Sequence, residues 1–402
     1  MSADLDLSQF GLSLQDLRQI LAQQVTCGSA DLLLACGSLV EGLGNSRSDL
    51  DMSLISADAP RGIEPERNGV VIAGRLLCDI LFLHPEDVEA LAGALAAATS
   101  GKRDVRGSAK RFSYFELRLM HRLATAIPIL PELGAVEAYR RLSGSFPVSA
   151  VARLKLDRSR YESSALQLDL AGLRDAGEWT SMVFAAQELL GWTLDALLAT
   201  HHLTNPTPKW RSKLLDRLPY GLMEQLLRIP RVGPPSWAAI LLNSAPSPPE
   251  PRSVSHHALR IAAFSRSVFL SAEQPLMDWR LEVPDLADAS TPHAVPSETL
   301  PALDLDVCLR TLDTRLEVFR LNDMHARMLV DAESAALAVL FDGRTTIAQA
   351  SHALAEKASC GSTGAKEHAQ RVRALRSALL DAGLTAPPLS IEWELDAAIA
   401  RQ

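Results

Sequence analysis

The feature that most constrains the fold is a short segment near the N-terminus, where one apolar run ends and the next begins with two acids. The first run, residues 31–36, is typical of a buried strand and ends at Gly37-Ser38. Small residues at that point let the backbone approach a ligand closely, and a helix starting there would point its N-terminal amides at an anion. A loop rich in Gly and Ser, ten residues long, then leads to Asp49.

Three carboxylates in this region indicate a metal site. Residues i and i+2 of a strand share a face, so Asp49 and Asp51 project together and repel each other unless a proton or a cation is bound. A third acid, Asp79, lies inside the apolar run 76–83, where a carboxylate is costly without a partner. Hard cations such as Mg²⁺ bind carboxylate oxygens, so neighbouring strands would form a three-carboxylate site.

Each acid also has an ordinary structural explanation. Ser48 and Asp49 could form a turn or a helix cap, and Asp51 could lie on the surface of an edge strand. Asp79 could pair with Arg75. The metal site is the preferred interpretation because all three acids occur together beside Gly-Ser.

The order Gly-Ser, about ten residues, Asp-x-Asp and a third Asp on a later strand resembles the nucleotidyltransferase superfamily related to DNA polymerase beta. Five residues fill this pattern: Gly37, Ser38, Asp49, Asp51 and Asp79. The resemblance covers roughly residues 14–100. It implies two Mg²⁺ ions, with Mn²⁺ as the alternative, held by the three aspartates. It also implies that Ser38 bonds the β- and γ-phosphates of an NTP, with ATP as the first choice, and that Gly37 and Ser48 belong to the same site.

The implied reaction moves a nucleoside monophosphate to a hydroxyl. The acceptor hydroxyl would attack the α-phosphate in line and release pyrophosphate, with Asp79 serving mainly the ion that activates the hydroxyl. The acceptor would be a small molecule, such as an aminoglycoside, or a peptide or protein. The alternative is a non-catalytic scaffold that recognises a leader peptide or a partner protein in a ribosomal-peptide pathway. An antitoxin-like nucleotidyltransferase acting on a toxin or RNA is less favoured, because of the long helical region and the extra C-terminal module.

Apolar periodicity and turn residues divide the chain into a mixed α/β (α+β) part and a helical part. Strands are expected at 31–36, 50–55, 69–73 and 76–83, and helices at 13–26, 85–98, 113–126, 134–143, 148–171, 175–200, 210–217, 221–228 and 255–272. The expected domains are a nucleotidyltransferase core with a mixed sheet over 1–110, an all-α bundle over 111–280, a Pro-rich linker over 281–304 and a small winged-helix domain over 305–388.

The helical part resembles the bundles of aminoglycoside and related small nucleotidyltransferases. Relatives carry a lysine there that contacts the triphosphate, so Lys209 is the candidate, although a solvated helix start explains it equally well. Arg122, in the stretch His121-Arg122-Leu123, resembles a residue of the relatives' connecting helices and is the second candidate for binding the nucleotide.

The C-terminal module resembles the PqqD-like winged helix-turn-helix. A hairpin is expected at 316–321 and 326–330, followed by helices at 331–340, 346–357 and 366–382, with Asp342-Gly343 as a turn. Domains of that family capture a leader peptide by adding it as a strand to an exposed sheet edge. DNA binding and dimerisation are the other roles that winged helices take.

Composition narrows the partners and the compartment. The formal net charge of −8 and the few aromatic residues argue against a protein that coats DNA or RNA. The N-terminus lacks the features of a secretory signal, and no continuous apolar run reaches the ~18 residues of a membrane span. Five cysteines without a CxxC pattern are expected to be free thiols, with Cys36 and Cys78 buried. A cytoplasmic protein is therefore expected.

Overall fold

The chain forms two compact units in a computed structural model. Unit 1 consists of Met1–Arg158 with His202–Lys213, and unit 2 of Ser159–His201 with Leu214–Gln402. The structure describes residues 5–64, 68–100, 104–129, 133–219, 250–273, 299–312, 315–323, 325–343, 345–357 and 362–386, together with the single positions 222 and 246. The expected helix at 221–228 and Cys360 fall wholly or almost wholly outside these residues.

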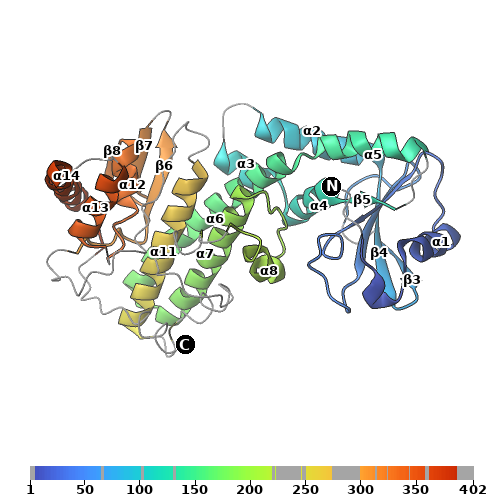
Figure 1. The fold of residues 1–402 in the computed structure, drawn as a ribbon, viewed down its shortest axis with the longest axis horizontal. Coiled ribbons are helices and arrows are strands. Elements are labelled where there is room, and N and C mark those ends of the chain that lie inside the picture. The colour runs from blue at the N-terminus through green and yellow to red at the C-terminus, as the bar shows by residue number, and fades with distance from the viewer. Residues whose placement is uncertain are drawn as a thin grey trace. The chain divides into compact units, whose positions relative to one another are not determined.

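Unit 1 is built on a mixed five-stranded sheet (Figure 1). Its strands are β1 Leu32–Cys36, β2 Leu50–Ile55, β3 Asn68–Ala73, β4 Leu76–Leu83 and β5 Ile127–Pro128, in the order β3-β4-β2-β1-β5. The pair β2 and β4 is parallel and the other pairs are antiparallel. The four strands expected from the sequence are confirmed, and β5 is an addition of two residues.

Helices cover both faces of this sheet, because the inner strands carry apolar side chains on both faces and β1 and β2 are buried along their whole length. The described α-helices of the unit are α1 Leu14–Gln24, α2 Pro85–Thr99, α3 Val105–Arg111, α4 Tyr114–Thr125, α5 Leu133–Ser145 and the first parts of α6 Val148–Ala176 and α8 Arg211–Leu215. Leu17 and Leu21 of α1 belong to the core on one face, and α2 and α4 contribute to the core on the other (Figure 1). A capping box of Ser13 and Asp16 starts α1, as the sequence predicts.

The face of the sheet that packs against α2 and α4 is covered along only part of its length. The candidate site lies on the part that is left uncovered. On β4, Leu81 and Leu83 are buried in the core that α2 and α4 complete. Two residues earlier on the same face, Asp79 is half-buried, and Leu77 beyond it is exposed. The sheet therefore opens toward solvent where the acidic side chains lie.

Unit 2 combines long helices with a small antiparallel sheet. Its described elements are the rest of α6, α7 Trp179–Thr200, α11 Pro251–Glu273, β6 Val307–Leu312, β7 Arg315–Arg320, β8 Arg327–Val330, α12 Ala332–Ala338, α13 Ile347–Lys357 and α14 Ser362–Asp381. Helices α7 and α11 pack against each other, and the sheet order is β6-β7-β8. The expected hairpin and three helices are confirmed, whereas β6 was not expected.

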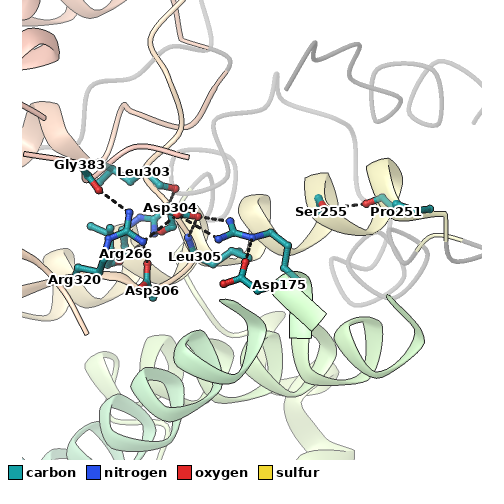
Figure 2. Close-up of polar contacts among 12 residues, drawn as sticks. Asp175, Pro251, Ser255, Arg266, Leu303, Asp304, Leu305, Asp306, Arg320 and Gly383 are labelled. Atoms are coloured by element: carbon teal, nitrogen blue, oxygen red, sulfur yellow. Dashed lines mark hydrogen bonds and ion pairs between the residues drawn. The ribbon is translucent and has the colours of Figure 1, made fainter. Parts of the chain in front are cut away.

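A buried arginine of α11 ties the segment before β6 into unit 2 (Figure 2). Arg266, only 3% exposed, donates hydrogen bonds to the carbonyl oxygens of Leu303, Asp304 and Val307 at 3.2, 3.0 and 3.1 Å. Residues 299–304, assigned to the linker by the sequence, include fully buried leucines and belong to this core. The rest of the expected linker lies outside the described residues.

Helix α7 is apolar enough to resemble a membrane span. The helix has 22 residues, and its most apolar stretch of 18 residues has a mean hydropathy of 1.3. Of that stretch, 61% is buried inside the protein. The search for a continuous apolar run did not detect this helix, because isolated polar residues interrupt its apolar sequence. The burial is that of a core helix packed against α11.

Candidate functional site

The three predicted metal ligands meet on adjacent strands. The parallel pairing of β2 and β4 sets Asp51 directly beside Asp79, and Asp49 immediately precedes β2. One carboxylate oxygen from each of the three lies within 4.8 Å of the others. Asp49 is exposed, Asp51 buried and Asp79 half-buried, so the group is open to solvent on one side. This cluster could hold a metal ion.

Two of the ordinary explanations for these acids fail. Asp51 lies on the central strand β2, at 8% exposure, and not on an edge. Asp79 accepts a hydrogen bond from Asn68 Nδ2 at 3.3 Å, and no ion pair with Arg75 occurs in the described chain. The turn explanation holds in part, because Ser48 Oγ accepts a hydrogen bond from the Asn45 N–H at 3.0 Å.

Gly37 is the residue that the site requires most strictly. Its φ is +77°, in the left-handed region that favours glycine. A Cβ at this position would lie 2.2 Å from Asp51 Oδ2. The glycine that ends β1 therefore makes room for a carboxylate of the acidic cluster.

The loop after Gly37 is a compact turn and not the start of a helix, which corrects that expectation. The Ser38 carbonyl accepts hydrogen bonds from the N–H groups of Leu43 and Gly44 at 2.8 and 2.9 Å. Ser38 itself is buried, at the end of β1 nearest the cluster. The phosphate-binding role expected for Ser38 thus cannot draw on a helix N-terminus and would depend on the turn.

Two arginines of α4 face the buried carboxylate. Arg122, itself buried, forms an ion pair with Asp51 Oδ1, and Arg118 Nη2 lies 3.8 Å from the same oxygen. Burial raises the pKa of Asp51 above its usual range, although Arg122 acts in the opposite direction. Arg122, expected to bind the nucleotide, thus contacts a predicted metal ligand.

The donor set fits a hard divalent cation. All three ligands are carboxylates, the oxygen donors that Mg²⁺ and Mn²⁺ accept. The two arginines offset only part of the negative charge of the three carboxylates, so the cluster still attracts a metal cation. Phosphates would be bound through that cation.

A buried polar network beside the cluster was missed by the sequence reasoning. His121 lies between Thr204 Oγ1, 2.8 Å from its Nδ1, and Glu41 Oε1, 2.9 Å from its Nε2. Asn205 donates to the same glutamate oxygen at 2.7 Å, and Lys155 Nζ donates to the Asn205 carbonyl at 2.7 Å. The network fixes the loop carrying Glu41 against α4, which carries the arginines. The sequence signal was His121 beside Arg122, but its partners are distant in the chain.

The basic segment around residue 209 contacts the loop after Gly37 through Lys213, whereas Lys209 is the residue that the resemblance suggests for binding the triphosphate. Lys213 Nζ donates to the Leu43 carbonyl at 2.7 Å. Lys209 is exposed, with its Nζ 5.0 Å from the centre of the ring of Trp210, which is buried. No hydrogen bond or ion pair links Lys209 to the acidic cluster within the part of the chain that the structure describes.

Comparison with known protein families found no match, and a search of curated proteins found none either.

Proposed function

We propose that the chain is a Mg²⁺-dependent nucleotidyltransferase that transfers a nucleoside monophosphate from an NTP to a hydroxyl group. The observation that carries the proposal is the convergence of Asp49, Asp51 and Asp79 beside a glycine turn that tolerates no side chain. A purely structural cluster would gain nothing from three mutually repelling carboxylates at an opening of the sheet. The resemblance in motif order points to the same reaction.

Each residue of the site has a definite task in this proposal. The three aspartates would hold the ions, and the Gly37–Gly44 turn would lie along the phosphates. Bound Mg²⁺ supplies charge neutralisation on the phosphates and lowers the pKa of the attacking hydroxyl. Arg118 and Arg122 hold Asp51 in place and add positive charge close to the transferred phosphate.

The reaction balances without any further reactant. The acceptor oxygen forms a bond to the α-phosphorus of the NTP, while the bond from that phosphorus to the oxygen bridging to the β-phosphate breaks. Pyrophosphate leaves, and the hydroxyl proton passes to solvent. The attacking oxygen, the phosphorus and the leaving oxygen lie roughly in line, so the acceptor enters on the side opposite to the departing pyrophosphate.

The test is release of pyrophosphate from ATP in the presence of Mg²⁺ and a panel of hydroxyl acceptors. Asp49→Asn and Asp79→Asn are expected to lower the rate at least about a hundredfold, since the metal contributes several kcal/mol to the transition state. Asp58→Asn, at an exposed aspartate outside the cluster, is the matched control and should keep the rate. Activity that survives both cluster substitutions would refute the assignment.

Peptide recognition by unit 2 is the second candidate function. Strand β8 forms an edge of the small sheet, and its Leu329 is 54% exposed. An exposed apolar strand at an edge is the surface to which a peptide can add by backbone pairing. A chain that binds a leader peptide but neither binds ATP nor releases pyrophosphate would favour this function over catalysis.

A further inference from the structure

Three exposed apolar side chains form a patch next to the acidic cluster. Val70 and Ile72 of β3 are 62% and 64% exposed, and Leu77 of β4 is 45% exposed. These three residues are called the β3–β4 patch below. Large apolar side chains gathered on one open surface indicate a place where something binds.

The register of the strands joins this patch to the cluster. In the antiparallel pair β3 and β4, Val70 lies directly opposite Asp79, and Ile72 lies opposite Leu77. Directly opposite residues project from the same face, with side chains in contact range. The patch is therefore a continuation of the surface that holds the carboxylates, and Val70 borders a predicted metal ligand.

The order of the strands places the patch on the acceptor's side of the site. Across the sheet, the turn at Gly37 follows β1, Asp51 lies on β2, Asp79 on β4 and the patch on β4 and β3. The proposed phosphate turn and the patch thus lie on opposite sides of the carboxylates. Because an in-line reaction brings nucleotide and acceptor from opposite directions, the acceptor belongs on the patch.

Strand β3 also offers backbone groups to this acceptor. It is an edge strand of the five-stranded sheet, with no described strand on its outer side. An edge strand with exposed apolar residues is a template for another extended chain. A polycationic acceptor would gain nothing from Val70, Ile72 and Leu77, whereas a peptide with apolar side chains would bury them.

We propose that the acceptor is a tyrosine in an extended peptide that pairs with β3 and covers the β3–β4 patch, a proposal that rests on the function proposed above. Strands in a sheet are about 4.8 Å apart, so the added strand would lie roughly 10 Å from β4. A serine or threonine hydroxyl stays close to its own backbone. The ring of a tyrosine can lie across Val70, and its phenol oxygen then points toward Asp79.

The chemistry follows the balance already given. The phenol oxygen forms the bond to the α-phosphorus of the NTP, pyrophosphate leaves with the bridging oxygen, and the phenol proton passes to solvent. The peptide carries a nucleoside monophosphate on its tyrosine.

The experiment uses the full chain, Mg²⁺ and ATP labelled at the α-phosphate, with synthetic nonapeptide libraries as the acceptor. The central residue is fixed as tyrosine, serine or phenylalanine, and the other positions are random mixtures that contain no tyrosine, serine or threonine. The tyrosine library is expected to take up at least about ten times more label than the serine library, with preferred apolar residues two positions from the tyrosine. The phenylalanine library should take up none.

A double variant with neutral polar residues, Val70→Ser with Ile72→Ser, tests the surface itself, because it removes apolar area without adding charge beside Asp79. It is expected to lower labelling at least about tenfold while ATP affinity, measured by calorimetry, changes less than about twofold. Leu380→Ser, at an exposed leucine of α14, is the matched control and should label normally.

Five outcomes would overturn the proposal. Equal labelling of the serine library would refute tyrosine as the acceptor. Normal labelling by the double variant would refute the patch as the binding surface. A wild-type dimer that the double variant converts to monomer would show that a second copy covers the patch. Bound ATP without any labelled peptide would refute this acceptor and leave the proposed function intact, whereas absence of ATP binding would refute both.

Discussion

At Gly37 the backbone and the Asp51 side chain share a space that has no room for another atom. The strand ends there in a left-handed conformation, and the carboxylate lies where a Cβ would project. Arg122 forms an ion pair with the other carboxylate oxygen. The position of this predicted metal ligand is therefore set jointly by a missing side chain and by an ion pair.

Gly37→Ala should displace Asp51 and destabilise unit 1. The substitution adds backbone strain of about 1–3 kcal/mol, and the clash with Asp51 adds to it. Loss of Mn²⁺ binding is expected together with a lower free energy of unfolding, measured by urea titration and metal titration.

Gly11→Ala separates the two effects. Gly11 has a φ of +70°, but nothing lies within 4 Å of a Cβ built there. This variant should lose stability through strain alone and keep its metal affinity. Equal metal affinity in both variants would contradict the role assigned to Gly37.

Residues close in sequence could be predicted, and their distant partners could not. The spacing of Asp49 and Asp51 on one strand is a local property, so the pattern predicts a shared face. Arg122 reaches Asp51 only because α4 packs on the sheet, and the Glu41 partner of His121 lies 80 residues away. Periodicity in the sequence does not reveal such pairings, so the ion pair of Arg122 with Asp51 could not be predicted.

Among the elements, the segment before β6 is held by opposed charges (Figure 2). Asp304 faces Arg174 and Arg320, and Arg320 also bonds Asp306 at 2.8 Å. Burial opposes ionisation of Asp304, but its hydrogen bonds and the nearby arginines outweigh burial and lower its pKa. For Asp306 burial prevails and raises the pKa. The pKa values of the two neighbouring acids are thus shifted in opposite directions.

Asp304→Asn should cost about 2–4 kcal/mol of unfolding free energy at pH 7, because charged hydrogen bonds between a buried carboxylate and two half-buried arginines are lost. A lowered folded-state pKa stabilises the protein above the unfolded pKa of about 3.9, and that stabilisation disappears as the pH falls through the folded pKa. The cost of Asp304→Asn should therefore shrink between neutral pH and about pH 3. Urea unfolding across this range measures it.

The stability cost of Asp306→Asn is expected to depend on pH in the opposite direction. A raised folded-state pKa makes the ionised carboxylate unfavourable in the fold above that pKa, so the cost of this substitution should fall as the pH rises. Parallel pH trends for the two variants would contradict the assigned pKa directions.

Strong periodicity predicted most elements, and weak periodicity explains the misses. The strands β1 to β4 and the long helices have apolar residues at regular spacing, so their positions agree with the prediction to within a few residues. Strand β5 has two residues, too few for any pattern. Strand β6 directly follows the Pro-rich stretch, and Asp304 and Asp306 masked the apolar alternation around it. Their cost is met by arginines that only the folded chain brings near.

At the scale of the whole molecule, contacts group the helices differently from the predicted domains. Helices α4 and α5 lie in unit 1 with the sheet, because their apolar faces complete its core. The C-terminal sheet shares a core with α11, through Leu270 and the Arg266 hydrogen bonds. Composition marks where proline accumulates, but it does not reveal which buried faces fit together.

The most direct test of the central claim is a titration of the full chain with Mn²⁺ in the presence of a non-hydrolysable ATP analogue, followed by electron paramagnetic resonance. Binding of Mn²⁺ is predicted for the wild type and for Asp58→Asn. Asp51→Asn should lower the affinity at least about tenfold, since a carboxylate ligand is lost. Wild-type protein that binds no Mn²⁺, or an Asp51→Asn variant that binds it equally well, would contradict a metal site at Asp49, Asp51 and Asp79.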